Sequence, residues 1–407
     1  MIFRVIQIEE DFDLNNICRG DGFLFVRDGV GIAGRGIAKR LTESEVLPFL
    51  ESVTSSHHTP EHSFDSEPMV FGLVPFSPDD EATFILSRIT FVKTSSGERF
   101  IIAAGDNEDE LSDGAMRELI SEALSGQPPR PTSNSYRISP KTPISQYLDA
   151  VVHARDTVRA GVLRKAVIAR DIEIHADDPL DVHAILLRLR ATFGSSYRYC
   201  VDDIIGASPE LLVQVEGRSV RSHPLAGTAP RTGDVVADAK LAAQLISSTK
   251  DQVEHRVVID MVHDTLLPHC SYLDWEAEPS IVTVANVQHL GTSIEGALTE
   301  PTTHIFELVR KLCPTPALGG FPSQQAIAFV QETENMERGF YGGAVGWMNR
   351  RGDGSFAVTI RCAELSADRR TARLFAGGGI VAESDPYSEL AETQAKFQAM
   401  MSAIIRP

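Results

Sequence analysis

Two short acidic stretches, far apart in the chain, repeat one spacing of charged residues. The first carries carboxylates at Asp251 and Glu254, and the second carries them at Glu389 and Glu392, with Lys396 four residues further on. Both stretches have sequences typical of helices, and a spacing of three or four residues places side chains on one face of a helix. Each stretch therefore predicts a helix with a charged face.

Two such faces could do chemistry if the fold brings them together. Four carboxylates in one place repel each other unless a divalent cation lies between them. Carboxylate oxygens suit Mg²⁺, which usually takes one or two carboxylates and completes its octahedron with water and an anionic substrate. This interpretation predicts a metal-assisted enzyme that acts on a small carboxylic acid. The spacing alone also allows the alternative that both charged faces are simply solvated.

The elements that must position these faces are alternating groups of strands and helices. Apolar patterning predicts a hairpin of 211–215 with 219–222, helices over 144–161, 179–193, 302–312, 323–332 and 386–404, and strands over 165–172, 197–202, 280–288, 340–348, 355–363 and 372–376. A further helix, which carries Glu254, follows the hairpin. The strands come in groups without regular βαβ spacing, which favours an α+β fold with largely antiparallel sheets.

The first 130 residues contain several short alternating runs that predict strands, and a Pro-rich break follows over 126–147. Within this region Gly29–Gly34 matches the GxGxxG pattern of dinucleotide sites, but no clear helix follows it. We therefore interpret Asp28 and Gly29 as a hairpin turn.

Composition excludes several classes of protein. The chain has 407 residues, of which 43% are hydrophobic and 23% charged, as is typical of a globular protein. A formal net charge of −18 argues against nucleic acid or an anionic membrane as a partner. No apolar run approaches the roughly 20 residues that span a bilayer, and the N-terminus turns acidic too early for a signal peptide. We therefore expect a cytoplasmic protein, and the five scattered cysteines predict free thiols.

Seven short sequences in the second half of the chain carry a family resemblance. They are Gly206–Leu212 (GASPELL), Pro224–Thr228 (PLAGT), Lys250–His255 (KDQVEH), Cys313–Pro322 (CPTPALGGFP), Val358–Ala363 (VTIRCA), Phe375–Val381 (FAGGGIV) and the helix with Glu389, Glu392 and Lys396. In this order and at this spacing they resemble the chorismate-utilising enzymes, and most closely the isochorismate synthases. The resemblance covers about residues 140–405, and the N-terminal 130 residues match only loosely.

The resemblance implies a single intertwined domain over residues 1–407. In this family two largely antiparallel sheets pack face to face as an α/β sandwich, and helices flank them. Residues 1–130 would supply strands that complete the sheets of the catalytic region, residues 140–405. The Pro-rich break would then be a connection inside one domain.

The resemblance also assigns two catalytic residues. Isochorismate synthases add water at C2 of chorismate while the C4 hydroxyl leaves. Lys165, which opens an apolar strand, matches the base for the water, and burial beside other cations would lower its pKa enough for this role. Glu210 matches the acid for the departing hydroxyl, because partial desolvation would keep it protonated. From the residues alone, Lys165 could be a surface lysine that pairs with an acid, and Glu210 an exposed residue at the start of a strand.

The metal ligands follow from the same resemblance. Glu254 and Glu392 match the direct ligands of Mg²⁺. Asp251 and Glu389 match an outer pair, which would hold metal-bound waters and fix the inner carboxylates. The resemblance therefore implies Mg²⁺ as the cofactor, held between the two acidic helices.

The residues that match substrate-binding positions offer cations, backbone groups or an imidazole: Gly227, Thr228, His289, Ala317, Arg361, Gly377, Gly379 and Lys396. Arg361 is the candidate for the enolpyruvyl carboxylate, since a guanidinium binds a planar carboxylate with two hydrogen bonds. Gly377–Gly379 could instead form a simple turn, and His289 could be a core histidine.

Two features select among the reactions of the family. Lys165 argues against amination, because anthranilate synthases generally have Gln at that position. Pro314–Leu318 has the isochorismate synthase form, whereas salicylate synthases have a Thr-Ala-Ser-Gly-like string there and also eliminate pyruvate. We predict an isomerase that converts chorismate to isochorismate reversibly, as a monomer without an amidotransferase subunit. A salicylate synthase and a non-catalytic chorismate-binding protein are the alternatives. The pathway, to menaquinone, a siderophore or salicylate, stays open.

Overall fold

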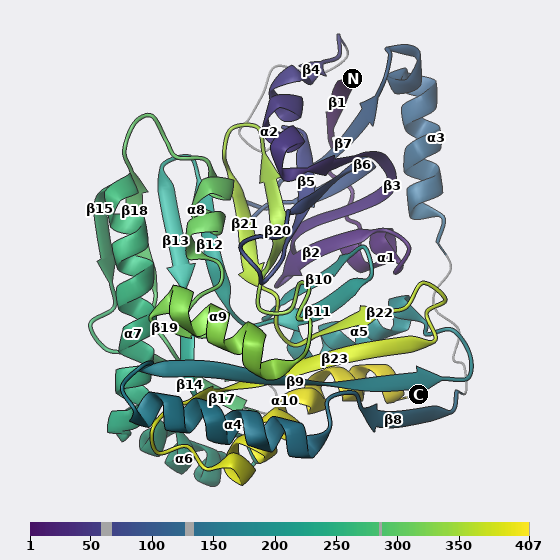
Figure 1. The fold of residues 1–407 in the computed structure, drawn as a ribbon. Helices are drawn as coiled ribbons and strands as arrows, with labels where there is room; N and C mark the ends of the chain where they lie inside the picture. Colours follow the sequence, from purple (N-terminus) through teal and green to yellow (C-terminus); the bar gives the residue numbers. More distant parts are fainter. Residues whose placement is uncertain (58–66, 127–133, 285–286, 407) are drawn as a thin grey trace.

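The computed structural model describes residues 1–57, 67–126, 134–284 and 287–406 (Figure 1). The α-helices of the described part are α1 Leu14–Cys18, α2 Glu43–Ser52, α3 Asp113–Leu124, α4 Ile144–Arg159, α5 Val182–Phe193, α6 Val235–Ser247, α7 Thr249–Leu266, α8 Ile305–Leu312, α9 Ser323–Glu334 and α10 Pro386–Ile405. Two short 3₁₀ helices cover Asp109–Leu111 and Leu267–His269.

The strands form two series along the chain, one from its N-terminal part and one from the rest. The first series is β1 Ile2–Gln7, β2 Phe23–Arg27, β3 Val30–Thr42, β4 Thr54–Ser55, β5 Met69–Val74, β6 Thr83–Lys93, β7 Arg99–Gly105 and β8 Tyr136–Pro140. The second series is β9 Lys165–Ala176, β10 Tyr197–Val201, β11 Ile204–Ser208, β12 Leu211–Glu216, β13 Ser219–His223, β14 Leu225–Pro230, β15 Cys270–Trp275, β16 Ser280–Val284, β17 Val287–Gly291, β18 Ile294–Leu298, β19 Gly320–Phe321, β20 Ala344–Asn349, β21 Gly354–Val358, β22 Cys362–Leu365 and β23 Thr371–Ile380.

Antiparallel pairing dominates the sheets, and only β1 with β4 is parallel among the strand pairs of the described residues. The predicted α+β fold with largely antiparallel sheets is confirmed. Hydrogen bonding links 20 strands into one continuous network, and β14, β17 and β16 form a separate three-stranded sheet.

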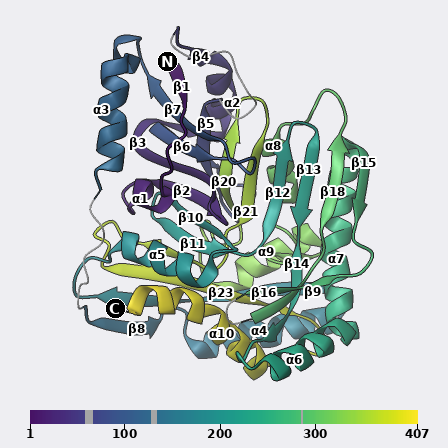
Figure 2. The same cartoon turned by 180° about the vertical axis from the view of Figure 1, so that it is seen from behind.

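The N-terminal strands pair directly with strands of the second half of the chain. β5 runs antiparallel to β20, and β2 runs antiparallel to β10, so segments more than 170 residues apart lie side by side (Figure 2). The aromatic rings of Phe71, Phe84 and Phe356, from both regions, are fully buried in one apolar cluster. Each fully buried aromatic side chain contributes a few kcal/mol of apolar burial. The N-terminal strands thus supply part of the core that they share with the second half of the chain.

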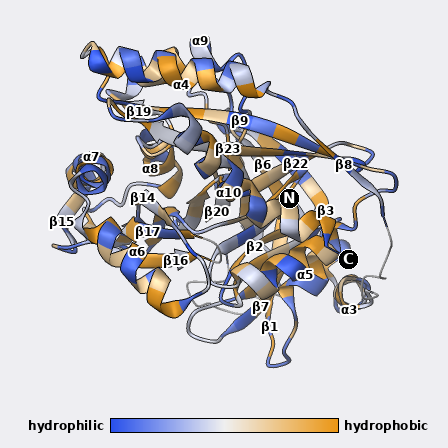
Figure 3. Ribbon diagram, turned by 90° about the horizontal axis from the view of Figure 1, so that it is seen from below, coloured by the Kyte–Doolittle hydropathy of each residue, from blue (hydrophilic) through white to orange (hydrophobic). Residues whose placement is uncertain are grey.

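Helices cover the long β9–β23 ladder. α4 and α9 pack against β9, and α10 packs against β23, α4 and α5. Figure 3 shows alternating apolar and polar bands along α4, and its buried residues (Tyr147, Ala150, Val151 and Ala154) recur every three to four positions. This spacing is that of one helical face, so α4 buries a single stripe against the sheet. The helices thus pack against both strands of the ladder.

Most predicted elements of the second half are present with shifted ends, and two predicted strands are wrong. The strand predicted over 355–363 is divided into β21 and β22, because Arg361 adopts a left-handed conformation with φ of 52°. The strand predicted over 280–288 is divided into β16 and β17, and residues 285–286 lie outside the described part. The helix predicted from 179 begins at Val182, since the Asp181 side chain caps it by accepting from Ala184 N at 3.0 Å.

The Gly29–Gly34 stretch is a hairpin, as predicted, and not a nucleotide loop. β2 and β3 are joined by Asp28 and Gly29, whose φ values of 50° and 83° are those of a tight two-residue turn. Of the Pro-rich break, residues 127–133 lie outside the described part. All five cysteines are free. Within the described ranges, none of the helices combines the length and apolar character needed to cross a membrane.

Candidate active site

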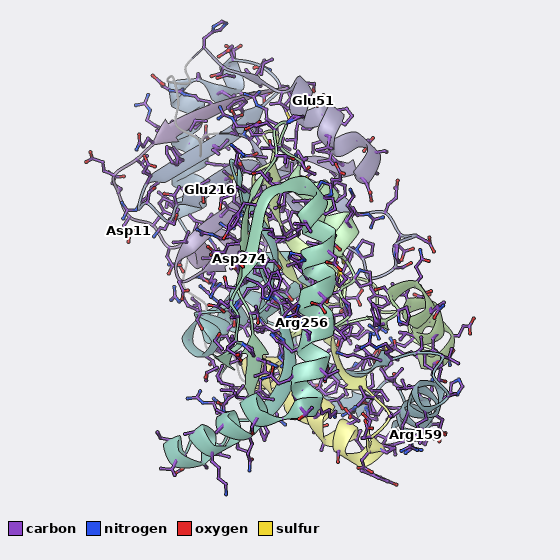
Figure 4. All side chains as sticks on the ribbon, turned by 90° about the vertical axis from the view of Figure 1, so that its left-hand side faces the viewer. Asp11, Glu51, Arg159, Glu216, Arg256 and Asp274 are labelled. Carbon is purple, nitrogen blue, oxygen red and sulfur yellow. The ribbon has the colours of Figure 1, made fainter. Side chains whose placement is uncertain are left out.

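The first acidic face lies on α7, and a cap fixes where that helix begins. The Ser248 side chain accepts from the backbone N–H of Asp251 at 3.3 Å, which starts the helix and places Glu254 one turn further on. Asp251 and Glu254 both line one cavity. The opposite face of α7 is solvated, where Arg256, labelled in Figure 4, pairs with Asp260 at 2.6 Å. The inward side of α7 thus carries the two carboxylates at its start and buried apolar residues such as Val258 and Val262 further along.

The second acidic face lies on α10 and reaches the same cavity. Glu389, Glu392 and Lys396 all line it. The Lys396 ammonium donates to the Glu392 carboxylate at 2.6 Å and to the Gly377 carbonyl oxygen at 2.7 Å. The first contact joins neighbours on one helical face, and the second ties α10 to β23. The two faces predicted from the sequence thus meet in one place.

Glycines of β23 allow the helices to approach the sheet this closely. Gly379 is paired with Val167 of β9, next to Lys165. A Cβ atom at position 379 would lie 2.6 Å from Glu254 Oε1 and 2.7 Å from Lys165 Cε, which is closer than atoms can pack. A Cβ at Gly377 would lie 3.1 Å from the Tyr341 hydroxyl. Both glycines are therefore part of a strand wall, and the alternative of a simple turn is wrong.

Lys165 is buried with 4% of its surface exposed, which excludes a surface lysine. Its ammonium donates to Glu254 Oε1 at 2.6 Å, across 89 residues of sequence. The sequence-based expectation placed Lys165 beside other cations; Lys250 lines the same cavity, but the direct charged contact of Lys165 is a carboxylate. The pair joins the start of β9 to the inward face of α7.

Glu210 lies between β11 and β12 and is 3% exposed, so it is not an exposed residue at a strand start. One carboxylate oxygen accepts from the Leu225 backbone N–H at 3.4 Å. Burial raises its pKa to about 8, although the Leu225 N–H and the charges of Lys165 and Arg361 favour the ionised form. At neutral pH most of this side chain is therefore protonated and can donate a proton.

Arg361 and His289 form a second buried pair at the cavity. The Arg361 guanidinium lies 3.3 Å from His289 Nε2, and since a guanidinium can only donate, Nε2 must accept. The ring proton then lies on Nδ1, 3.2 Å from the Gly227 carbonyl oxygen and 3.1 Å from Thr228 Oγ1. Burial, followed by the charges of Arg361 and Lys396, lowers the pKa of His289 to about 3. A neutral imidazole therefore orients Arg361 without competing for an anion.

The pKa values of the two α10 glutamates shift in opposite directions. Burial, and then the charge of Glu392, raises the pKa of Glu389. Burial also favours the neutral form of Glu392, but the contact with Lys396 outweighs it and lowers the pKa of Glu392. Among the described residues, no three His, Cys, Asp or Glu side chains lie close enough to form a ready metal centre. Lysines hold Glu254 and Glu392 instead.

The cavity has a volume of about 250 Å³. Every residue assigned to the site from the sequence lines it: Lys165, Glu210, Gly227, Thr228, Asp251, Glu254, His289, Ala317, Arg361, Gly377, Gly379, Glu389, Glu392 and Lys396. Sequence reasoning missed Lys250 and Tyr341, which also line it. Lys250 could have been found from the sequence, because it is the neighbour of Asp251. In the structure its charge favours the ionised forms of both α10 glutamates. Tyr341, stacked on Phe375 at 5.2 Å, carries no such signal.

Comparison with known proteins places this geometry in a family. Residues 32–405 match the sequence family described as chorismate binding enzyme. The chain belongs to the chorismate-binding enzyme family. The isochorismate synthase DhbC of Bacillus subtilis is 33% identical over 92% of this chain and 91% of its own length. The vibriobactin-specific isochorismate synthase of Vibrio cholerae is 32% identical over 94% and 91%.

A solved structure shows the same fold for this chorismate-binding enzyme. The structure of MenF, the menaquinone-specific isochorismate synthase from Escherichia coli, superimposes with a TM-score of 0.85. The match covers 99% of this chain and 95% of that one, at 24% identity. The predicted fold class and the predicted family are both confirmed.

Proposed function

We propose that this chorismate-binding enzyme is an isochorismate synthase, an isomerase that interconverts chorismate and isochorismate. The observation that carries the proposal is the pairing, in one cavity, of a buried amine at Lys165 with a buried carboxyl group at Glu210 that stays protonated at neutral pH. Moving a hydroxyl group from C4 to C2 requires one group that takes a proton from water and one that gives a proton to the departing hydroxyl. The names of the relatives agree with this chemistry.

In the proposed reaction the two groups have distinct roles. Lys165 takes a proton from the water that attacks C2, and Glu210 protonates the C4 hydroxyl as its bond to carbon breaks. One water is consumed and one is released, and the enolpyruvyl side chain is retained. Because the Lys165 ammonium holds Glu254 in this structure, its role as base requires that it give up this contact and a proton.

Arg361 would bind the enolpyruvyl carboxylate. It is 8% exposed, its Nε has no hydrogen-bond partner, and it takes part in no ion pair of the described residues. A buried guanidinium without a carboxylate is poised to accept one from a ligand. Lys396, Thr228 and the backbone at Gly377 and Gly379 would complete the contacts to the substrate.

The carboxylates of α7 and α10 fit Mg²⁺. They supply only oxygen ligands, which this hard cation prefers, and the mutual repulsion of Glu389 and Glu392 would be relieved by a cation between the helices. Glu254 and Glu392 would be the direct ligands, with Asp251 and Glu389 around them, once the two lysine contacts are exchanged. A bound Mg²⁺ would supply positive charge that anchors the ring carboxylate of the substrate.

Product analysis tests the proposal. The purified chain, incubated with chorismate and Mg²⁺, should give isochorismate on HPLC and no pyruvate in a lactate dehydrogenase-coupled assay. The reverse reaction from isochorismate should give chorismate. Formation of salicylate with equimolar pyruvate would instead identify a salicylate synthase. Chorismate binding without turnover would identify a non-catalytic binding protein. No amidotransferase is added, because the proposed reaction incorporates no nitrogen.

A further inference from the structure

A second arginine, outside the active site, is buried without a counterion. Arg198 lies on β10 between Val26 of β2 and Ala207 of β11, and only 2% of its surface is exposed. Its Nη1 donates to Asn15 Oδ1 at 2.8 Å, while its Nε has no hydrogen-bond partner. None of the ion pairs within the described ranges includes it. A buried charge in this state is costly unless an anion completes its surroundings.

Arg198 lines a cavity of about 480 Å³ beside the N-terminal strands. The cavity is bounded by Asp11, Phe12, Asp13, Leu14, Asn15, Val26, Asp28, Gly29, Lys93, Arg190, Gly194 and Arg198. Its size is that of small-molecule sites in proteins. Asp11, labelled in Figure 4, lies at the surface of this region.

The other charges of this cavity already have partners. Lys93 pairs with Asp11 at 2.6 Å, and Arg190 pairs with Asp13. The Asp28 carboxylate lies 3.5 Å from Arg27 Nε. Among the cations that line the described part of this cavity, Arg198 is therefore the one without a carboxylate partner. Burial, and then the like charge of Arg190, lowers the pKa of Arg198 to about 10, as expected for a cation that needs an anion.

Arg198 shares this state with Arg361. Three arginines of the described chain, Arg4, Arg198 and Arg361, have a buried Nε without a partner. Arg4 differs from the other two, because it pairs with Asp113 at 2.6 Å. The remaining two are both buried, both line a cavity and both lack an ion pair. The same chemistry that suits Arg361 to a ligand carboxylate therefore applies at Arg198.

We propose that the cavity at Arg198 is a second ligand site that binds a small monocarboxylate with an apolar body. The planar carboxylate would receive hydrogen bonds from the guanidinium. A single negative charge suits the site, because three aspartates line it and would repel a dianion. The apolar body is matched by Phe12 and Val26, which line the same cavity.

Isothermal titration with benzoate tests the site. Because benzoate could also bind Arg361, the titration is made in an Arg361→Met variant, in which the Arg198 cavity is intact. The expected result is binding of one benzoate, weakened at least about tenfold when Arg198→Met is added, which is the loss expected for a hydrogen bond to a charged group. Benzamide, which has the same shape and no charge, should not bind. Equal binding of benzamide, or no effect of Arg198→Met, would overturn the proposal.

A second measurement covers the case that Arg198→Met does not fold. Crystals of the unaltered protein, soaked in 4-bromobenzoate, should show an anomalous bromine peak inside the cavity at Arg198. Absence of that peak, with bromine elsewhere or nowhere, would overturn the proposal. Neither experiment involves chorismate or turnover, so failure here is distinct from failure of the isochorismate synthase assignment.

Discussion

Glu210→Gln tests how strongly the pocket holds a proton on its proposed acid. Burial raises the pKa of Glu210 from an ordinary 4.5 to about 8. The folded protein therefore binds this proton more tightly than the unfolded chain. At ~1.4 kcal/mol for each pH unit, the difference amounts to ~5 kcal/mol of unfolding free energy, as an order of magnitude.

The sign of the effect follows from the raised pKa. The stabilising contribution is fully present below pH 4.5, declines as the pH rises, and is lost above about pH 8. A glutamine has no proton to lose. The unfolding free energy of the unaltered protein, minus that of Glu210→Gln, should therefore fall by ~1.4 kcal/mol per pH unit across this window. Glu210→Gln should also lose turnover by at least ~100-fold, since the proposed general acid is gone.

Urea denaturation at half-unit steps from pH 4.5 to 9 measures this difference. Glu216→Gln is the matched control, because Glu216 lies at the exposed end of strand β12, which follows Glu210 (Figure 4). It controls for the loss of one carboxylate from the same region. A difference between the unaltered protein and Glu210→Gln that does not change with pH would refute the raised pKa. Near-normal turnover of Glu210→Gln would assign the acid elsewhere.

Three further predictions concern buried charges. Glu254→Gln should abolish Mg²⁺-stimulated turnover without unfolding, as judged by circular dichroism, and activity that persists in EDTA would contradict the metal role. Lys165→Ala should lower kcat by ~10²–10⁴ while calorimetry still detects chorismate binding, and an unchanged rate would discredit the base. Arg338→Met should lower the unfolding free energy by ~3–5 kcal/mol in urea, because it leaves buried Glu334 without its partner. A loss below ~1 kcal/mol would show that the site tolerates an unpaired Glu334.

What the sequence could predict is mostly local. The acidic faces of α7 and α10 follow from spacings of three and four residues, which depend only on helix geometry. The contact of Lys396 with Glu392 also follows from helix geometry, because the two residues are four positions apart. The contact of Lys165 with Glu254 does not, because it joins residues 89 positions apart, and no pattern along the chain specifies which strand end meets which helix. The carboxylate partner of Lys165 was therefore not predicted from the sequence.

The break between β21 and β22 shows a second limit. Residues 355–363 have the apolar pattern of one strand, yet Arg361 takes a left-handed conformation and turns its side chain to His289. A positive φ in a residue other than glycine costs about 1–3 kcal/mol, so only the surrounding structure can maintain it. The strand propensity of residues 355–363 favoured one continuous strand. The tertiary contacts of Arg361, the residue proposed to bind substrate, outweighed that propensity.

The glycine stretch of β23 limits how this scaffold can acquire new specificity. Where Gly377 and Gly379 form the wall, a methyl group at 377 would press on the Tyr341 hydroxyl, and one at 379 would displace the Glu254 carboxylate. At these two positions the strand presents backbone and no side chain to the cavity. A change of substrate preference is therefore expected at lining positions that already carry a side chain, such as Thr228 and Ala317.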